Sequence, residues 1–166
     1  MIMRCPGLIL RWLHELAQAV ILDPPDMLIG GPHDPYLERW FVIPRNPIFN
    51  IYLHIFRRDD EDRVLHDHPW PSCSIILTQG YREHFPGGGI AWRAPGQIVF
   101  RRARAAHRIS IVSAYAGGRA AFPMSLFITG PRIRRWGFHC PKGWVHWKDF
   151  VDPTDRGAVG PGCGEP

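Results

Sequence analysis

Glycine and proline interrupt this chain so often that long helices are disfavoured over most of its length. The 166 residues include 17 glycines and 17 prolines, more than average usage, and they follow no collagen period or internal repeat. Because proline lacks a backbone N–H and glycine favours turns, the segments between them must be short. The frequent glycines and prolines therefore favour a fold of many short β-strands.

Ten short segments between these turn residues have the alternating or apolar pattern of β-strands. They are residues 37–43, 48–56, 73–79, 81–85, 90–93, 97–101, 107–112, 124–129, 132–138 and 144–150. In residues 48–56, alternation places apolar side chains on one face and Asn50, Tyr52 and His54 on the other. The spacing predicts an antiparallel barrel or sandwich, one face of which lines a polar interior.

The two ends of the chain differ from this pattern. Apolar residues at helical spacing predict an amphipathic helix over 8–22, which the Asp23-Pro24-Pro25 sequence ends. The tail after Asp152 has only scattered small apolar residues, which predicts disorder. We therefore expect a helix and covering loop over 1–35, a barrel over 36–151 and a disordered tail over 152–166.

Composition limits the compartment and the partners. Hydrophobic residues make up 45% of the chain and charged residues 21%, which is typical of one globular domain with a single core. The four cysteines, Cys5, Cys73, Cys140 and Cys163, form no CxxC motif, and a core of this size needs no disulfides. We therefore expect a reducing, cytoplasmic setting. Charged residues interrupt the apolar N-terminal segment, so no membrane partner is expected.

The strongest chemical signal is the sequence His66-Asp67-His68. Histidines two residues apart on an extended segment project to the same face and can share one metal ion, whereas Asp67 points away and is interpreted as structural. His107, which opens an apolar strand, is the best candidate for a third ligand. Three imidazoles leave coordination positions open, as catalytic metal sites do.

These residues resemble the two motifs of the cupin superfamily. In the first motif, two histidines are followed by an acid and a glycine, and the matching positions are His66, His68, Cys73 and Gly80. The second motif matches at Gly96, Ile98-Val99-Phe100 and His107, with Arg102 where proline is common. The resemblance covers about residues 60–112 and implies an all-β, cupin-like antiparallel jelly-roll barrel with an N-terminal helix.

Cys73 in place of the acid is similar to the cysteine dioxygenase-type thiol dioxygenases. That resemblance implies Fe(II) as the divalent metal on His66, His68 and His107, a site role for Cys73, and binding of a substrate carboxylate by the guanidinium fork of Arg39. The later Ser-x-His-x-Tyr strand of that family would fall at residues 125–129, where its histidine and tyrosine are absent. No Cys–Tyr crosslink is expected.

The sequence thus predicts an Fe(II)-dependent dioxygenase that acts on a small thiol or carboxylate substrate. Two alternatives remain open: a non-redox metal cupin, an isomerase or lyase whose ion acts as a Lewis acid, and a non-enzymatic ligand-binding module. Cys73 itself can equally be a small buried hydrophobe. An exposed edge strand of such a barrel can pair with that of a second copy, which permits a homodimer.

Two other features stand outside the cupin motifs. The basic runs at residues 101–104 and 132–135 are interpreted as solvated strands and turns, and no nucleic-acid partner is predicted. Residues 136–147 hold three of the seven tryptophans together with His139, Cys140 and His146. Because this segment lacks the paired spacing of a zinc module, we expect aromatic packing that closes one end of the barrel.

Overall fold

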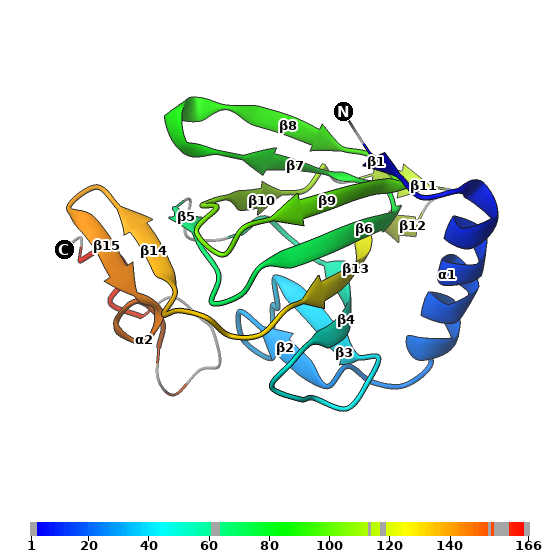
Figure 1. The fold of residues 1–166 in the computed structure, drawn as a ribbon, viewed down its shortest axis with the longest axis horizontal. Coiled ribbons are helices and arrows are strands. Elements are labelled where there is room, and N and C mark those ends of the chain that lie inside the picture. The colour runs from blue at the N-terminus through cyan, green and yellow to red at the C-terminus, as the bar shows by residue number, and fades with distance from the viewer. Residues whose placement is uncertain are drawn as a thin grey trace.

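The fold is described from a computed structural model, which describes residues 3–60, 64–112, 114–116, 119–152, 154 and 160–164. Antiparallel strands dominate it (Figure 1). The elements are β1 (Met3–Arg4), α1 (Gly7–Val20), β2 (Met27–Ile29), β3 (Leu37–Phe41), β4 (Asn50–Phe56), β5 (Leu65–His66), β6 (Ser72–Thr78), β7 (Tyr81–His84), a 3₁₀ turn (Pro86–Gly88), β8 (Ile90–Arg93), β9 (Gln97–Arg101), β10 (Arg108–Ser110), β11 (Ala114–Ala116), β12 (Arg119–Ala121), β13 (Met124–Thr129), β14 (Gly137–Cys140), β15 (Gly143–His146) and α2 (Trp147–Phe150).

Two sheets form the barrel. A seven-stranded sheet has the order β1-β9-β6-β13-β4-β3-β2, and a three-stranded sheet has the order β10-β7-β8. Leu37, Phe56 and Ile76 of the larger sheet pack against Tyr81 of β7, so the apolar interior joins the two sheets. The predicted all-β, cupin-like jelly roll with an N-terminal helix is confirmed.

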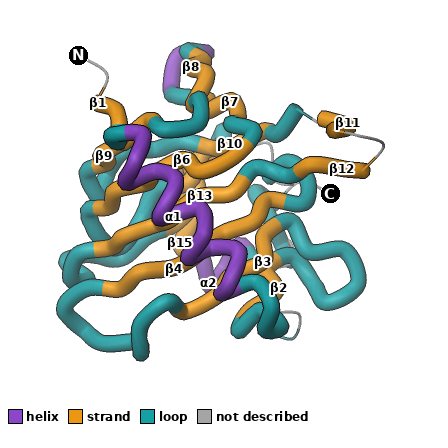
Figure 2. Tube along the Cα trace, turned by 90° about the vertical axis from the view of Figure 1, so that its right-hand side faces the viewer, coloured by secondary structure: helices purple, strands orange, loops and turns teal. Residues whose placement is uncertain are grey.

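Helix α1 lies across the outer face of the seven-stranded sheet (Figure 2). Ala17 is 1% exposed and belongs to a cluster with Trp40, Leu53, Leu77 and Leu126. The helix ends at Val20, two residues before the predicted end. Neither helix in the described residues has the length and hydropathy of a membrane span.

A third sheet, with the order β15-β14-β5, carries the predicted aromatic cluster. Phe138 stacks on Phe150 with ring centroids 3.7 Å apart, and Trp136 stacks on Trp147 at 5.7 Å. Two elements here differ from the predicted strands: the strand predicted over 132–138 forms only from Gly137, and residues 147–150 form α2. Aromatic stacking across α2 outweighs the local strand pattern.

The C-terminal segment corrects two predictions. Cys140 forms a disulfide with Cys163. The expected reducing setting had implied that all four cysteines are free, so this prediction is wrong for these two. Gly160 and Gly162 both donate a backbone hydrogen bond to the Phe150 carbonyl, at 3.0 and 3.1 Å. Residues 160–164 of the predicted disordered tail are therefore fixed to the third sheet. Sequence spacing could not reveal this attachment because it depends on a tertiary contact.

The N-terminal segment contributes more than a helix and a covering loop. Strand β1 pairs with β9, and β2, inside the predicted loop, pairs with β3. Both strands are very short and lie at the edges of the seven-stranded sheet, where two or three backbone pairs suffice and the sequence pattern is correspondingly weak.

Candidate metal centre

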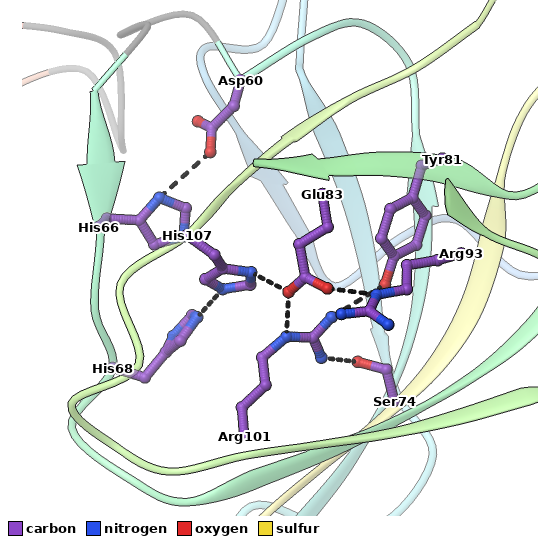
Figure 3. Close-up of polar contacts among 9 residues, drawn as sticks. All are labelled: Asp60, His66, His68, Ser74, Tyr81, Glu83, Arg93, Arg101 and His107. Atoms are coloured by element: carbon purple, nitrogen blue, oxygen red, sulfur yellow. Dashed lines mark hydrogen bonds and ion pairs between the residues drawn. The ribbon is translucent and has the colours of Figure 1, made fainter. Parts of the chain in front are cut away.

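The three predicted histidines lie together at the end of the barrel next to the third sheet. One ring nitrogen from each of His66, His68 and His107 lies within 4.8 Å of the others. Nε2 of His68 and Nε2 of His107 are 2.9 Å apart (Figure 3). The structure therefore brings together two positions that are separated by about forty residues of sequence.

Backbone pairing explains this convergence. His66 and His107 form an antiparallel bridge with two hydrogen bonds of 2.9 Å, each N–H donating to the other residue's carbonyl. The N–H of Asp67 instead donates to the Gly137 carbonyl, and that of His68 to the Ala103 carbonyl. This extended path turns Asp67 away and directs both histidines to one side, as the i, i+2 spacing predicts.

Two carboxylates orient the imidazoles. Nδ1 of His66 lies 3.2 Å from Oδ2 of Asp60, and Nδ1 of His107 lies 2.7 Å from Oε1 of Glu83. The hydrogen bond to Glu83 places the ring proton of His107 on Nδ1 and leaves its Nε2 lone pair directed toward the cluster. Carboxylates that hold the far nitrogen of a histidine in this way are a regular feature of protein metal sites.

Glu83 is the centre of a buried polar network that sequence reasoning missed. Its carboxylate is 1% exposed and accepts hydrogen bonds from Nε of Arg93 and Nε of Arg101, both at 2.5 Å. Arg101 also donates to Oγ of Ser74 at 2.8 Å and to the Tyr81 hydroxyl at 3.3 Å. A signal existed, because alternation in residues 81–85 puts Glu83 on the same face as the apolar ring of Tyr81.

Electrostatics keep His68 and His107 neutral and Glu83 ionised. Burial lowers the pKa of His107 to about 4, although its hydrogen bond to Glu83 acts in the opposite direction. Burial, followed by the neighbouring His107, lowers the pKa of His68 well below its ordinary value. Burial opposes ionisation of Glu83, but the hydrogen bond from His107 and the charge of Arg101 outweigh it and lower its pKa. Neutral imidazoles are the form that binds metal.

A divalent cation fits this donor set. One ligand nitrogen from each of the three histidines lies within 4.8 Å of the others, a spacing that one ion can span with bonds of about 2.1 Å. Three protein ligands would leave further coordination positions of such an ion open.

Arg39 lies on the inner face of the barrel, as the proposed substrate role requires. Its Nε donates to Nε2 of His54 at 2.9 Å, and its guanidinium lies 4.8 Å from the Tyr52 ring centroid. His54 in turn stacks on Phe127, whose ring lies 5.8 Å from that of His68. The polar face predicted for residues 48–56 thus extends from Arg39 to the histidine cluster.

Cys73 does not reach this cluster. The next residue on β6, Ser74, contacts Arg101 inside the barrel, so Cys73 points to the outer face. Its partner across the sheet is Phe100, which is 66% exposed. Burial raises the pKa of the Cys73 thiol. This placement corrects the expected site role, because position within a motif does not fix the side of the strand that faces the metal.

The aromatic segment does not provide a second set of metal ligands. Cys140 is committed to the disulfide, and His139 lies 3.2 Å from Oδ2 of Asp67. Among the described residues, the grouping suited to a metal ion is the His66, His68 and His107 cluster.

No family model matches the sequence, and no curated protein matches it. Solved structures with similar folds include the DMSP lyase DddQ from Ruegeria pomeroyi, at 15% identity and a TM-score of 0.49 over 66% of this chain and 54% of that one. This chain thus spans about half the length of that lyase.

Two further solved structures have a similar fold. A putative mannose-6-phosphate isomerase from Ralstonia eutropha has 16% identity and a TM-score of 0.47, over 64% of this chain and 92% of that one. An RmlC-like cupin family protein from Methanocaldococcus jannaschii has 10% identity and a TM-score of 0.45, also over 64% and 92%.

Proposed function

We propose that this chain is a metal-dependent enzyme that acts on a small carboxylate-bearing substrate. The proposal rests mainly on one arrangement: His66, His68 and His107 share an inner face with Arg39, a cation that forms no ion pair with any described residue. When bound to the histidines, a divalent ion would supply open coordination positions for substrate or dioxygen and would act as a Lewis acid.

In this proposal, Arg39 binds the carboxylate of the substrate. Arg39 is half-buried; a cation in such a position without a counter-ion is unfavourable, and a substrate carboxylate would compensate it. His54 accepts the Nε hydrogen bond, and burial, followed by the charge of Arg39, keeps its pKa well below the ordinary value. A neutral His54 can therefore hold the guanidinium in place while both terminal nitrogens remain available for a two-pronged carboxylate contact.

We further propose Fe(II) as the ion and dioxygen as the co-substrate. Three clustered histidine ligands support an ion with open coordination positions, to which dioxygen and substrate could bind. A non-redox isomerase or lyase is the second candidate. It is favoured by Phe127 and Thr129, which stand where the thiol dioxygenase pattern has histidine and tyrosine, and by the outward orientation of Cys73.

The oligomeric state and the cellular location of the protein stay predictions. They are a homodimer formed through an edge strand and a cytoplasmic location. The Cys140–Cys163 disulfide stands against the cytoplasmic location, because such bonds persist mainly in oxidising compartments.

Oxygen uptake tests the reaction class. The protein would be reconstituted anaerobically with Fe(II), Ni(II) or Zn(II) and supplied with cysteine, cysteamine or lactate, which carry a thiol and a carboxylate, a thiol alone and a carboxylate alone. We expect uptake with Fe(II) and the carboxylates but not with cysteamine. Substrate turnover with Zn(II) or Ni(II) and no uptake would select the non-redox candidate. If no metal supports turnover, the enzyme proposal fails and a ligand-binding module remains.

Replacing Arg39 tests the carboxylate contact. We expect Arg39→Gln to lower kcat/KM by roughly 10- to 100-fold, mostly through KM, because a charged hydrogen bond to the substrate is lost. Arg39→Lys should recover part of the loss, since it keeps the charge but not the planar fork. Arg82→Gln, on the exposed face of β7, is the matched control and should leave KM unchanged. An unchanged KM in Arg39→Gln would refute this role.

A further inference from the structure

A pocket open to solvent, lined in part by Asp67, lies outside the histidine cluster. It has a volume of about 450 Å³, and its lining residues are Asp67, Arg104, Arg134, Arg135, His139 and Trp144. Three sequence features that the proposed function does not use meet here: both basic runs and the aromatic segment of residues 136–147. Of the two basic runs, Arg101 is buried inside the barrel, whereas Arg102, Arg104, Arg132 and Arg135 are exposed to solvent as expected.

The buried side chain of Asp67 contacts several of the residues that line the pocket. Its carboxylate is 2% exposed and lies 2.8 Å from Nη1 of Arg134 and 3.2 Å from Nε2 of His139. It also accepts hydrogen bonds from the Gly137 N–H at 3.0 Å and from Nε1 of Trp144 at 3.2 Å. The charge of Arg134 is thereby balanced, and the indole ring of Trp144 is held in a fixed orientation.

Two cations of the pocket remain unbalanced. Arg104 and Arg135 are exposed and form no ion pair with any residue in the described ranges. Beside them, the Trp144 side chain is 42% exposed although its N–H is already bonded. The pocket therefore offers two guanidinium groups for an anion and a fixed aromatic face for a planar ring.

We propose that this pocket binds a nucleoside phosphate. The phosphate would lie between Arg104 and Arg135, whose planar forks suit phosphate oxygens, and the base would stack on Trp144. A volume of about 450 Å³ is in the range of small-molecule sites. The lining offers one aromatic face and the two exposed guanidinium groups, which match one base and one phosphate better than an extended nucleic-acid strand. The site is separate from the metal centre, because none of the three clustered histidines lines it.

Isothermal titration calorimetry with the full-length protein tests this proposal, with AMP, adenosine and inorganic phosphate as probes. We expect one AMP to bind per chain, more tightly than either adenosine or phosphate. The double variant Arg104→Ala/Arg135→Ala should weaken AMP binding at least about 10-fold. Trp144→Ala should weaken AMP and adenosine alike, whereas Trp144→Phe, which keeps an aromatic face, should retain most of the affinity.

The matched control is Arg102→Ala/Arg132→Ala, which removes the same charge from the same two runs at exposed positions outside the pocket lining. AMP affinity in this control should stay within about twofold of the unmodified protein. An equal loss in both double variants would overturn the proposal in favour of general electrostatic attraction. Phosphate binding as tight as AMP binding, or no AMP binding, would also overturn it. So would salt-sensitive binding of single-stranded RNA without saturation by AMP.

His107→Ala separates this proposal from the proposed function. AMP binding should survive that substitution unchanged, whereas metal-dependent turnover should not. Loss of AMP binding in His107→Ala would place the nucleotide at the metal centre and contradict a separate pocket.

Discussion

At the scale of single residues, Glu83 links the candidate metal centre to the barrel interior. One carboxylate oxygen accepts hydrogen bonds from Nδ1 of His107 and Nε of Arg101, and the other oxygen accepts one from Nε of Arg93. His107 and Arg101, which could not be buried separately without a large penalty, are thus buried around one carboxylate, and the half-buried Arg93 completes the network. Removing that carboxylate would leave two arginines without their counter-ion.

Glu83→Gln is therefore expected to destabilise the protein by about 3–5 kcal/mol. The physical reason is the loss of a buried charge that pairs with Arg93 and Arg101, whose side chains are 21% and 5% exposed. Urea unfolding followed by circular dichroism measures the free energy of unfolding. The control is Glu38→Gln, because Glu38 pairs with Arg57, whose side chain is 36% exposed. That pair should contribute at most about 1 kcal/mol, and equal losses in both variants would contradict the network.

The residues of the site differ in how far sequence could predict them. The pair His66 and His68 was predictable because their relative direction follows from strand alternation alone. His107 required the motif resemblance. Alternation with Tyr81 marked Glu83 as inward-facing, but neither Glu83 nor Asp60 could be assigned to a histidine, because these contacts depend on tertiary packing. The predicted site role of Cys73 was wrong for a related reason. Its spacing fitted a motif, but the sheet register places its side chain on the outer face.

At the scale of elements, the β14–β15 hairpin is built around a close backbone approach. A Cβ atom at Gly137 would lie 2.0 Å from the Val145 carbonyl oxygen and 2.9 Å from the Trp144 ring. Gly137 also pairs with His146 across the hairpin and donates its N–H to Asp67. The hairpin and the wall of the outer pocket therefore both require glycine at this position.

Gly137→Ala should accordingly cost about 1–3 kcal/mol of folding stability, as overpacking in a closed space does. Gly7→Ala serves as the comparison, because no atom lies within 4 Å of the added Cβ at the start of α1. That variant should change stability by no more than about 0.5 kcal/mol. Thermal unfolding of the two variants side by side measures the difference, and a Gly137→Ala protein as stable as Gly7→Ala would argue against the close packing.

Element prediction succeeded where local pattern and tertiary packing agree. Helix α1 and strands such as β4 and β9 lie where periodicity placed them, because apolar residues repeat on the face that packs. Strand β2 and α2 were missed. The first depends on pairing with β3 and the second on ring stacking around Trp147 and Phe150. The same holds for Cys163, whose partner lies 23 residues earlier.

At the scale of the whole molecule, the histidine cluster lies where the third sheet meets the barrel, at a junction that backbone hydrogen bonds also hold. His66 belongs to the third sheet, His107 precedes β10 of the three-stranded sheet, and Phe127 of the seven-stranded sheet packs against His68. An ion on the three histidines would therefore connect the third sheet to the barrel. Such an ion stabilises the folded state in proportion to its binding free energy.

Anaerobic calorimetric titration with Fe(II) tests this central claim most directly. We predict one site per chain in the unmodified protein. Affinity should fall at least about 100-fold in His66→Ala and in His107→Ala, since even losing the outer partners of metal ligands costs 10- to 100-fold. His84→Ala is the control, because His84 bonds to Ser110 at 2.7 Å outside the cluster, and it should bind Fe(II) like the unmodified protein. Equal Fe(II) binding in all four proteins, or none in any, would contradict the account.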